Sequence, residues 1–489
     1  MLFNSYIFIF AFLPIVIVGW NLLNKYGKYK AAQVFIIFVS LVFYGYFNVS
    51  YLAIIIASVL VNYGVSYVLS LDKISTNKSL LKLISTSAVL FNLGLIFYFK
   101  YFDFFIENIN KIFLCNFQLR NIMLPLGISF FTFQQIGFVI DRCKGDAPHY
   151  SFIDYASFIL YFPQLVAGPI IKHGKIIPQF QNEENRKFNI ENFTKGIILF
   201  VIGLAKKVLI ADTFAKMANY GWNNISTLDS VSAIVVMVSY TFEIFFDFSG
   251  YCDMAMGIGW MMNIDIPLNF NSPYKSKSVK EFWKRWHITL GEFFTNYVYI
   301  PLGGNRKGII RTVINVMIVF LLSGIWHGAN WTFIVWGLMH GLCVAIENIL
   351  GNKRKDSPVT WISTFVFVNI SWVLFRSNSI TEALEFYRRI VLFDINGSIS
   401  GVVSALSSSV SYVPTLILDK IINNGSLIYH SVEMIALFTS ATILCCGQNS
   451  REYVEHMTLT NKKAVIFAAI FCYSIISLSS VSIFLYFNF

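Results

Sequence analysis

The stretch Thr312-Val-Ile-Asn-Val-Met-Ile-Val-Phe-Leu-Leu-Ser-Gly-Ile-Trp-His-Gly-Ala-Asn-Trp331 belongs to an apolar run, from about Thr312 to Ile346, that contains no Asp, Glu, Lys or Arg. At roughly 20 residues per crossing, such a run can hold two membrane-spanning helices. His327 lies inside it. An ionisable side chain at membrane depth is costly and therefore indicates a functional site, and the ordinary pKa of histidine suits proton transfer near neutral pH. The alternative is a histidine that only packs in the protein interior.

The composition of the whole chain predicts a multi-pass membrane protein. Of 489 residues, 56% are hydrophobic and 13% are charged, and the mean hydropathy of +0.63 is far above that of an ordinary soluble domain. The apolar runs are continuous and lack the alternation of barrel strands, so they predict helices. We expect about 10–12 spans. The uncharged runs are at about 5–24, 31–71, 83–99, 121–140, 155–171, 230–242, 312–346, 359–375, 434–446 and 464–489, and those at 31–71 and 312–346 can each hold two helices.

The net charge of +11 is concentrated in short basic connections. The positive-inside rule places such connections on the cytoplasmic side, and they are too small and too separated to form a nucleic-acid surface. They lie at Lys25 to Lys30, Lys275 to Arg285, Arg306 to Arg311, and Lys353 to Lys355. The seven cysteines have no paired ligand spacing, so neither a zinc site nor a disulfide framework is predicted.

The first apolar segment, Tyr6 to Leu23, has no basic region before it and no cleavage site after it, so we expect a retained span. No interval is typical of a linker, and residues 1–489 are expected to form one membrane-embedded domain. Its last span, 464–489, carries a C-terminal aromatic tail.

The interval 271–311 is unusual because aromatic residues are interleaved with charged ones. This pattern favours an interfacial or re-entrant segment over a solvated loop. Within it, Phe282, Trp286 and Thr289 or Leu290 recur at helical spacing, which predicts one buried face. An amphipathic anchor without any further role is the alternative.

Pro163, Gly168 and Pro169 interrupt the apolar run at 155–171. A helix is expected to kink or break there. Broken helices at membrane depth are tolerated mainly where they line a cavity enclosed by protein. These three residues are therefore expected to shape the interior of the molecule.

Glu243 and Asp247 lie four residues apart in an aromatic stretch and so share one helical face. Carboxylates at this depth need partners. One possibility is a structural pairing with Arg285 or another cation, which is the expected role of Glu243. The other is that they orient a catalytic histidine.

Five short motifs follow one another along the chain. They are Tyr161-Phe-Pro-Gln-Leu-Val-Ala-Gly-Pro169, Phe246-Asp-Phe-Ser-Gly-Tyr-Cys-Asp253, Phe282-Trp-Lys-Arg-Trp-His287, Tyr299-Ile-Pro-Leu-Gly-Gly-Asn-Arg306 and Trp326-His-Gly-Ala-Asn-Trp331. In this order they resemble the membrane-bound O-acyltransferase family, and within it the bacterial alginate O-acetylases and related polysaccharide O-acetyltransferases. The resemblance runs through nearly the whole chain. It implies an all-α fold whose spanning helices surround a central funnel.

The resemblance also implies a reaction and its residues. An acyl group, expected to be acetyl, would pass from a cytosolic thioester such as acetyl-coenzyme A to an extracytoplasmic polysaccharide, with no metal and no tightly bound cofactor. His327 matches the family's catalytic histidine and is expected to be the general base, and His287 matches a second histidine that orients the substrate or polarises the thioester carbonyl. Donor or substrate binding is expected of Lys284, Arg285, Asn271, Tyr274 and Asn330, and Asp247, Pro163, Gly168 and Pro169 are expected to shape the funnel.

Because the donor is cytosolic and the polymer is outside, the resemblance implies a relay in the bacterial inner membrane. An extracytoplasmic hydrolase-like partner of the SGNH type would receive the acyl group, and Tyr486, in the tail Phe484-Leu-Tyr-Phe-Asn-Phe489, would carry it transiently. The alternative for Tyr486 is an aromatic residue at the membrane interface. Two other functions remain open: D-alanyl transfer to teichoic acid, and transport of lipid-linked sugars, although a transporter predicts internal repeats that the sequence does not show.

Overall fold

The computed structural model describes residues 1–351, 356–394, 399–408, 425–478, 484 and 485, and within them helices are the only regular secondary structure. Eight helices in this part of the chain are long and apolar enough to cross a membrane. They are Phe8–Lys25, Ser50–Val68, Lys78–Phe113, Ser230–Met261, Gly308–His327, Trp331–Leu350, Pro358–Arg376 and Leu427–Cys446. The protein is an all-α, multi-pass membrane protein, as its composition predicts.

The described residues contain fewer full spans than expected because several apolar runs form shorter helices. The run at 31–71 divides into α2 (Tyr29–Gly45) and α3 (Ser50–Val68), as predicted, but α2 has only 17 residues. The run at 155–171 breaks at Tyr161 into α8 (Phe152–Leu160) and α9 (Phe162–Leu165), also as predicted.

The C-terminal run at 464–489 is described only in part. It begins within α24 (Asn461–Ile476), which has 16 residues. Residues 479–483 and 486–489, with Tyr486, lie outside the described residues.

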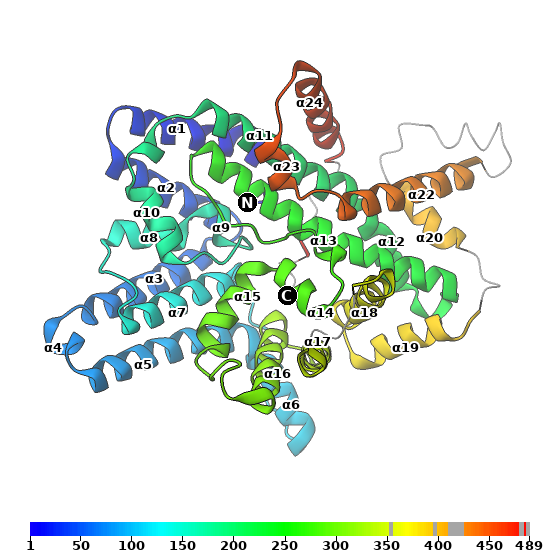
Figure 1. The fold of residues 1–489 in the computed structure, drawn as a ribbon, viewed down its shortest axis with the longest axis horizontal. Helices are drawn as coiled ribbons and strands as arrows, with labels where there is room; N and C mark the ends of the chain where they lie inside the picture. Colours follow the sequence, from blue (N-terminus) through cyan, green and yellow to red (C-terminus); the bar gives the residue numbers. More distant parts are fainter. Residues whose placement is uncertain (352–355, 395–398, 409–424, 479–483, 486–489) are drawn as a thin grey trace.

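Two long helical segments lie side by side across the centre of the molecule (Figure 1). One is α13 (Ser230–Met261), which is buried along most of its length. The other is continuous from α11 (Ile190–Ala205) through the π-helical turn η4 (Lys206–Ala211) to α12 (Asp212–Asn223). In Figure 1 the N-terminal helices α3, α5 and α7 and the later helices α16 to α18 lie below this pair, whereas α22 to α24 lie above it.

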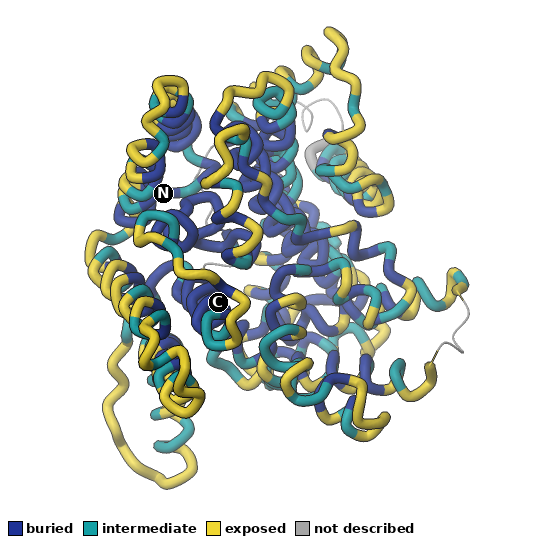
Figure 2. Tube along the Cα trace, turned by 60° about the vertical axis from the view of Figure 1, so that its left-hand side comes forward, coloured by how far each residue is buried: buried dark blue, intermediate teal, exposed yellow. Residues whose placement is uncertain are grey.

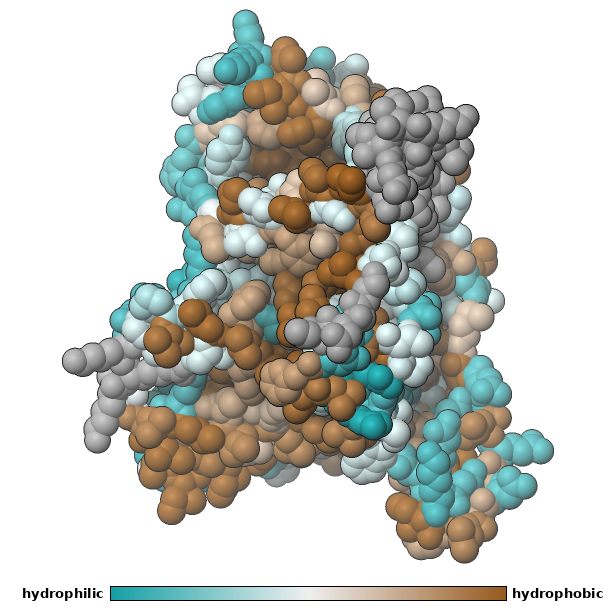
Figure 3. Space-filling model, turned by 90° about the vertical axis from the view of Figure 1, so that its right-hand side faces the viewer, coloured by the Kyte–Doolittle hydropathy of each residue, from teal (hydrophilic) through white to brown (hydrophobic). Residues whose placement is uncertain are grey.

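Burial follows the same arrangement. The central helices are largely buried, whereas exposed positions concentrate on the outer helices (Figure 2). Apolar side chains cover much of one outer face, with hydrophilic side chains gathered toward its edges (Figure 3). An apolar exterior of this kind suits contact with lipid, because the helices already satisfy their own backbone groups.

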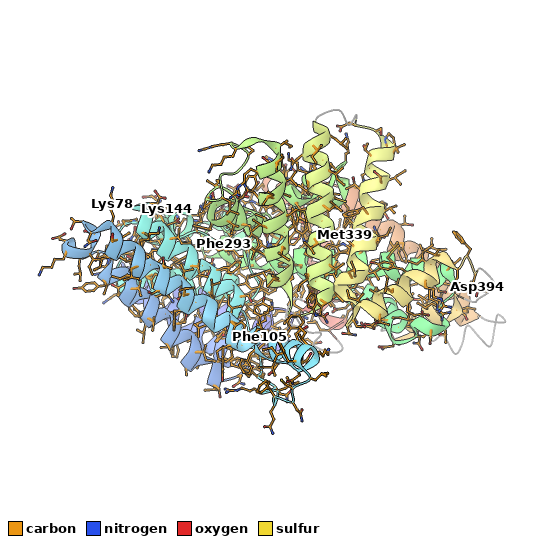
Figure 4. The ribbon with its side chains drawn as sticks, turned by 90° about the horizontal axis from the view of Figure 1, so that it is seen from below. Lys78, Phe105, Lys144, Phe293, Met339 and Asp394 are labelled. Carbon is orange, nitrogen blue, oxygen red and sulfur yellow. The ribbon has the colours of Figure 1, made fainter. Side chains whose placement is uncertain are left out.

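The N-terminal half contains a continuous helical segment formed by α5 (Lys78–Ile96), the π-helical turn η2 (Phe97–Tyr101) and α6 (Phe102–Phe113). α7 (Ile128–Lys144) packs against α5. Lys78 and Lys144 lie at the same end of this pair and Phe105 lies toward the other, so the two helices are antiparallel (Figure 4).

The interval 271–311 contains short helices in place of a span: α14 (Val279–Arg285) and α15 (Ile288–Phe294), followed by the π-helical turn η7 (Thr295–Tyr299). Phe282, Trp286 and Leu290 are buried, as their spacing predicts. The expected single helix is divided at His287. The remaining helices are η1 (Phe8–Phe12), α1 (Leu13–Lys25), α4 (Asp72–Ser75), α10 (His173–Gln181), α16 (Gly308–His327), α17 (Trp331–Leu350), α18 (Pro358–Arg376), α19 (Ile380–Val391), α20 (Ser400–Ser404), α22 (Gly425–Cys446) and α23 (Ser450–His456), with single 3-10 turns at Glu184–Arg186, Ile225–Thr227, Pro273–Lys275 and Ala405–Ser408.

The run at 312–346 forms the antiparallel pair α16 and α17, as predicted. The two backbones approach closely at Gly324 and Gly337. A Cβ atom on Gly337 would overlap the carbonyl oxygen of Phe320, and one on Gly324 would overlap that of Phe333. Small residues allow this type of contact between membrane helices, where dispersion supplies much of the attraction.

Gly337→Ala is expected to lower the midpoint of thermal unfolding in detergent, because the added methyl group forces the helices apart at a cost of about 1–3 kcal/mol. Gly64→Ala is the matched control, since a Cβ atom on Gly64 of α3 meets no atom within 4 Å. The control is expected to leave the midpoint unchanged or raise it. Equal midpoints for the two variants would contradict the close packing of α16 on α17.

Candidate active site

His287 and His327 meet in the interior although 40 residues separate them (327 − 287). His287 joins α14 to α15, and His327 is the last residue of α16. The indole of Trp326 contacts both imidazoles, with ring centroids 5.9 Å from His287 and 5.0 Å from His327. The exposed fractions of His287 and His327 are 1% and 3%. The fold therefore assembles the histidine cluster that the motifs predict.

Aromatic rings surround this cluster. Phe248 lies 5.0 Å from His287, and Trp336 and Phe375 lie 5.1 and 5.2 Å from His327, centroid to centroid. A charged imidazole is disfavoured in such surroundings, and burial lowers the pKa of His287, which lies outside the spans, to about 3. His287 is therefore neutral at physiological pH. A neutral imidazole accepts a proton at one ring nitrogen and donates from the other.

The backbone at His287 is left-handed, with φ 47° and ψ 52°. A residue with a Cβ atom adopts this conformation at a cost of roughly 1–3 kcal/mol and keeps it only where its surroundings impose it. Two backbone hydrogen bonds hold the segment: Asn271 N–H donates to the Arg285 carbonyl, and Ile288 N–H donates to the Asn269 carbonyl. The strained turn ends α14 and directs His287 toward Trp326.

The end of α16 is held by the continuous α5–η2–α6 segment. Lys100 Nζ donates to the carbonyl oxygens of Trp326 and His327, at 2.6 and 3.0 Å, and the Tyr101 hydroxyl donates to the Ile325 carbonyl at 2.5 Å. The last carbonyls of a helix have no partner within the helix, and a cation there is favourable. Lys100 and Tyr101 therefore determine where α16 stops and where His327 lies.

Two cavities lie near the histidine cluster, and both meet the chain around the C-terminal end of α16. The first, of about 600 Å³, meets α16 before His327, at Val319, Phe320 and Ser323; we call it the His287 cavity because His287 lines it. The second, of about 760 Å³, is lined by the residues that follow His327, from Gly328 to Asn330; we call it the Asn330 cavity.

The two cavities differ in their charged residues. Lys280, Lys284 and Glu292 line the His287 cavity. The Asn330 cavity is lined by three basic and three acidic side chains, which are Lys100, Lys207, Arg376, Asp212, Glu243 and Asp247.

The residues predicted to bind substrate are divided between several places. Lys284 lines the His287 cavity, as a donor-binding residue requires, whereas Asn330 lines the other cavity and caps α17 through its side chain. Arg285 pairs with Glu281 at 2.9 Å and donates to the Asn271 carbonyl at 3.2 Å.

Tyr274 is buried and donates to the Thr241 carbonyl at 2.8 Å. Arg285, Asn271 and Tyr274 thus support the turn around His287, and none of the three lines either cavity. Their predicted role in binding stays a prediction.

Pro163, Gly168, Pro169 and Asp247 are all buried, and their predicted role in shaping the funnel stays a prediction. A Cβ atom on Gly168 would overlap the backbone of Gln164, so the chain beyond α9 folds back tightly after Pro163, with Pro169 at the turn. Asp247 is paired, but its cation is Lys207, 2.5 Å away, and not the Arg285 that we considered. The sequence did not indicate Lys207 because η4 and α13 are distant in the chain.

A third buried histidine, His340 of α17, was not predicted as a site residue. Its Nδ1 accepts a hydrogen bond from Trp283 Nε1 at 3.1 Å, and its Nε2 lies 2.9 Å from Ser371 Oγ. The Ser371 hydroxyl donates to the Val368 carbonyl, so it accepts from His340, whose proton is therefore on Nε2. Both ring nitrogens are engaged, and the bond to Trp283 fixes an indole that lines the His287 cavity.

Comparison with known proteins agrees with this geometry. The model of the MBOAT, membrane-bound O-acyltransferase family matches residues 43–383. The chain belongs to this family. The peptidoglycan O-acetyltransferase of Helicobacter pylori is 37% identical over 100% of this chain and 98% of its own length. The probable alginate O-acetylase AlgI of Pseudomonas aeruginosa is 37% identical, with 80% and 75% covered, and the teichoic acid D-alanyltransferase of Bacillus subtilis is 27% identical, with 52% and 69% covered. The protein is an O-acyltransferase, as its motifs predict.

Lys100→Met is expected to reduce the activity of this acyltransferase and to lower its thermal midpoint, since two carbonyls at the end of α16 lose their donor at a cost of about 1–3 kcal/mol. Lys463→Met is the control, because Lys463 Nζ also donates to a backbone carbonyl, that of Thr458, away from the site. Acyl transfer by membranes carrying each variant provides the measurement. Full activity of Lys100→Met would contradict the role of Lys100 in holding His327.

Proposed function

We propose that this acyltransferase takes an acetyl group from a cytosolic thioester, acetyl-coenzyme A, and transfers it through the bacterial inner membrane for O-acetylation of an extracytoplasmic polysaccharide or other envelope polymer. The observation that carries the proposal is a pair of cavities near one histidine cluster, one lined by His287 and by α16 before His327, the other by the residues that follow His327. A thioester in one cavity and a hydroxyl group in the other would meet at His287 and His327. The proposal requires no metal and no tightly bound cofactor.

The His287 cavity is the proposed donor site. Lys280 and Lys284 line it, and the neighbouring connections at Lys275 to Arg285 and Arg306 to Arg311 are the basic ones that the positive-inside rule assigns to the cytoplasm. Lysine ammonium groups bind phosphate oxygens through charge-assisted hydrogen bonds. The phosphates of coenzyme A would lie at these lysines, with the thioester near His287.

The histidines divide the chemistry. Neutral His327 takes the proton of the acceptor hydroxyl as its oxygen attacks the thioester carbonyl carbon, and an N–H of His287 stabilises the negative charge that develops on the carbonyl oxygen. The carbon–sulfur bond then breaks, and the proton on His327 passes to the departing thiolate. The products are an ester and free coenzyme A, with no net release of a proton.

The extent of the similarities favours acetyl transfer over D-alanyl transfer. The relatives named as peptidoglycan O-acetyltransferase and alginate O-acetylase match 100% and 80% of the chain, whereas the D-alanyltransferase of Bacillus subtilis matches 52%. An acceptor of the polysaccharide type follows from the same relatives.

Delivery to a polymer outside the membrane involves, in this proposal, an extracytoplasmic SGNH-type partner. Leu485 lines the Asn330 cavity, and its backbone N–H donates to Asp247 at 2.9 Å. Tyr486 is the next residue in the chain. It lies outside the described residues, and its role as a transient acyl carrier stays a prediction.

His327→Ala is expected to lower acetyl transfer by roughly 10²–10⁴-fold, and His287→Ala by roughly 10²–10³-fold, because the first removes the base and the second a hydrogen-bond donor to the oxyanion. His456→Ala, on the surface of α23, is the control with unchanged activity. Acetylation of the cell-envelope polymer is measured at matched membrane levels. Normal acetylation by His327→Ala would refute the proposed mechanism.

Trp283→Phe is expected to raise the KM for acetyl-coenzyme A roughly fivefold and to leave kcat nearly unchanged, because it removes the hydrogen bond to His340, worth about 1 kcal/mol, that fixes the cavity wall. Trp361→Phe is the matched control, since its indole donates to the Tyr274 carbonyl at 2.7 Å, and Trp361 does not line the His287 cavity. Steady-state kinetics of the purified proteins separates the two constants. A change in kcat alone would place Trp283 outside donor binding.

A further inference from the structure

Glu243 is a buried carboxyl group that accepts no hydrogen bond from the part of the chain that the structure describes. It lies in the middle of α13, and its exposed fraction is 3%. Among the described residues no hydrogen bond and no ion pair reaches this carboxyl group, and its Oε2 atom is buried without a partner. Glu243 lines the Asn330 cavity, which is the direction from which a ligand can reach it.

Asp247 shows that the lack of a partner is particular to Glu243. It lies one turn further along the same face of α13 and lines the same cavity, but Lys207 Nζ is 2.5 Å from its Oδ1 and the Leu485 N–H donates to its Oδ2. Lys207 is also paired with Asp212, at 2.9 Å. Lys207 is therefore already paired with two carboxylates, those of Asp212 and Asp247. Asp247 has a structural ion pair, whereas Glu243 has none of this kind among the described residues.

Arg376, which lines the same cavity, attracts the Glu243 carboxylate electrostatically, but among the described residues no cation forms a close ion pair with it. Burying a carboxyl group without a hydrogen-bonding partner destabilises a protein by several kcal/mol at most sites. An apolar side chain of similar volume would avoid this cost. The Glu243 carboxyl group destabilises the fold and faces a cavity, and this combination indicates that it binds a ligand.

The Asn330 cavity suits a neutral ligand that carries hydroxyl groups. Its volume of about 760 Å³ is within the range of small-molecule sites, and it extends from Glu243 to the residues that follow His327. Its three acidic and three basic side chains give no formal excess of either charge, so nothing in the lining favours a strongly charged molecule. A carboxyl group that has no internal donor is suited to accept a hydrogen bond from a hydroxyl group.

We propose that Glu243 binds the acceptor of the acyl group. Its carboxyl group accepts a hydrogen bond from a hydroxyl of that acceptor in the Asn330 cavity. The bond positions the acceptor beside His327 for attack on the thioester carbonyl. This inference rests on the proposed function, because it takes the Asn330 cavity as the acceptor side. Glu243 is a specificity-determining residue that contacts substrate, and it takes no part in the transfer of the proton.

The test compares stability with activity in Glu243→Met and in Asp247→Asn. Glu243→Met is expected to raise the thermal midpoint of the purified protein, because it removes a buried carboxyl group that has no internal partner, and to lower polymer acetylation roughly tenfold or more through the loss of a hydrogen bond to a charged group. Asp247→Asn is the matched control on the same helical face. It is expected to lower the midpoint, because it weakens a buried ion pair.

Glu243→Gln separates hydrogen bonding from packing. Its amide oxygen still accepts a hydrogen bond from a hydroxyl group, so it is expected to retain more acetylation than Glu243→Met.

Two outcomes would overturn the inference. A lower midpoint for Glu243→Met would mean that the carboxyl group has a partner within the protein. A raised midpoint with normal polymer acetylation would mean that it does not contact the acceptor. Failure of the proposed function gives a different result, in which the wild-type protein does not turn over acetyl-coenzyme A or His327→Ala retains full activity.

Discussion

A helix that ends in the interior of a membrane protein exposes carbonyl groups that no water can satisfy, and α16 ends in this way at His327. Lys100 and Tyr101 supply the missing donors from a segment more than 220 residues away in the chain. This contact joins the N-terminal helices to the second half of the molecule. It also fixes the position of His327 and of the residues that follow it, which line the Asn330 cavity.

The parts of this architecture that depend on local sequence were predictable. Continuous apolar runs predicted the paired helices at 31–71 and 312–346, and Pro163 predicted the break between α8 and α9. The motifs predicted that His287 and His327 belong to one site. The partners of these residues were not predictable, because they come from distant segments: Lys100 at the end of an apolar run, and Lys207 opposite Asp247 in place of Arg285.

Three of the buried histidines, His287, His327 and His340, illustrate why residue type alone does not identify a catalyst. His340 lies in the same apolar run as His327 and is fully buried, but the indole of Trp283 and the hydroxyl of Ser371 engage both of its ring nitrogens. His287 and His327 lie among aromatic rings beside the two cavities. Position relative to a cavity cannot be read from sequence spacing, so the spacing alone does not separate His340 from the two histidines of the proposed site.

The aromatic packing of the histidine cluster has a bioenergetic consequence. An energised membrane has an electrochemical gradient for protons. Two cavities with titratable imidazoles between them could let protons pass from one cavity to the other down that gradient. The rings of Trp326, Trp336 and Phe375 pack around His327, and that of Phe248 packs on His287. A chain of water molecules is difficult to form in such a dry contact. The same rings would thus help the proposed enzyme, with one cavity for a cytosolic donor and one for an extracytoplasmic acceptor, to preserve the proton-motive force.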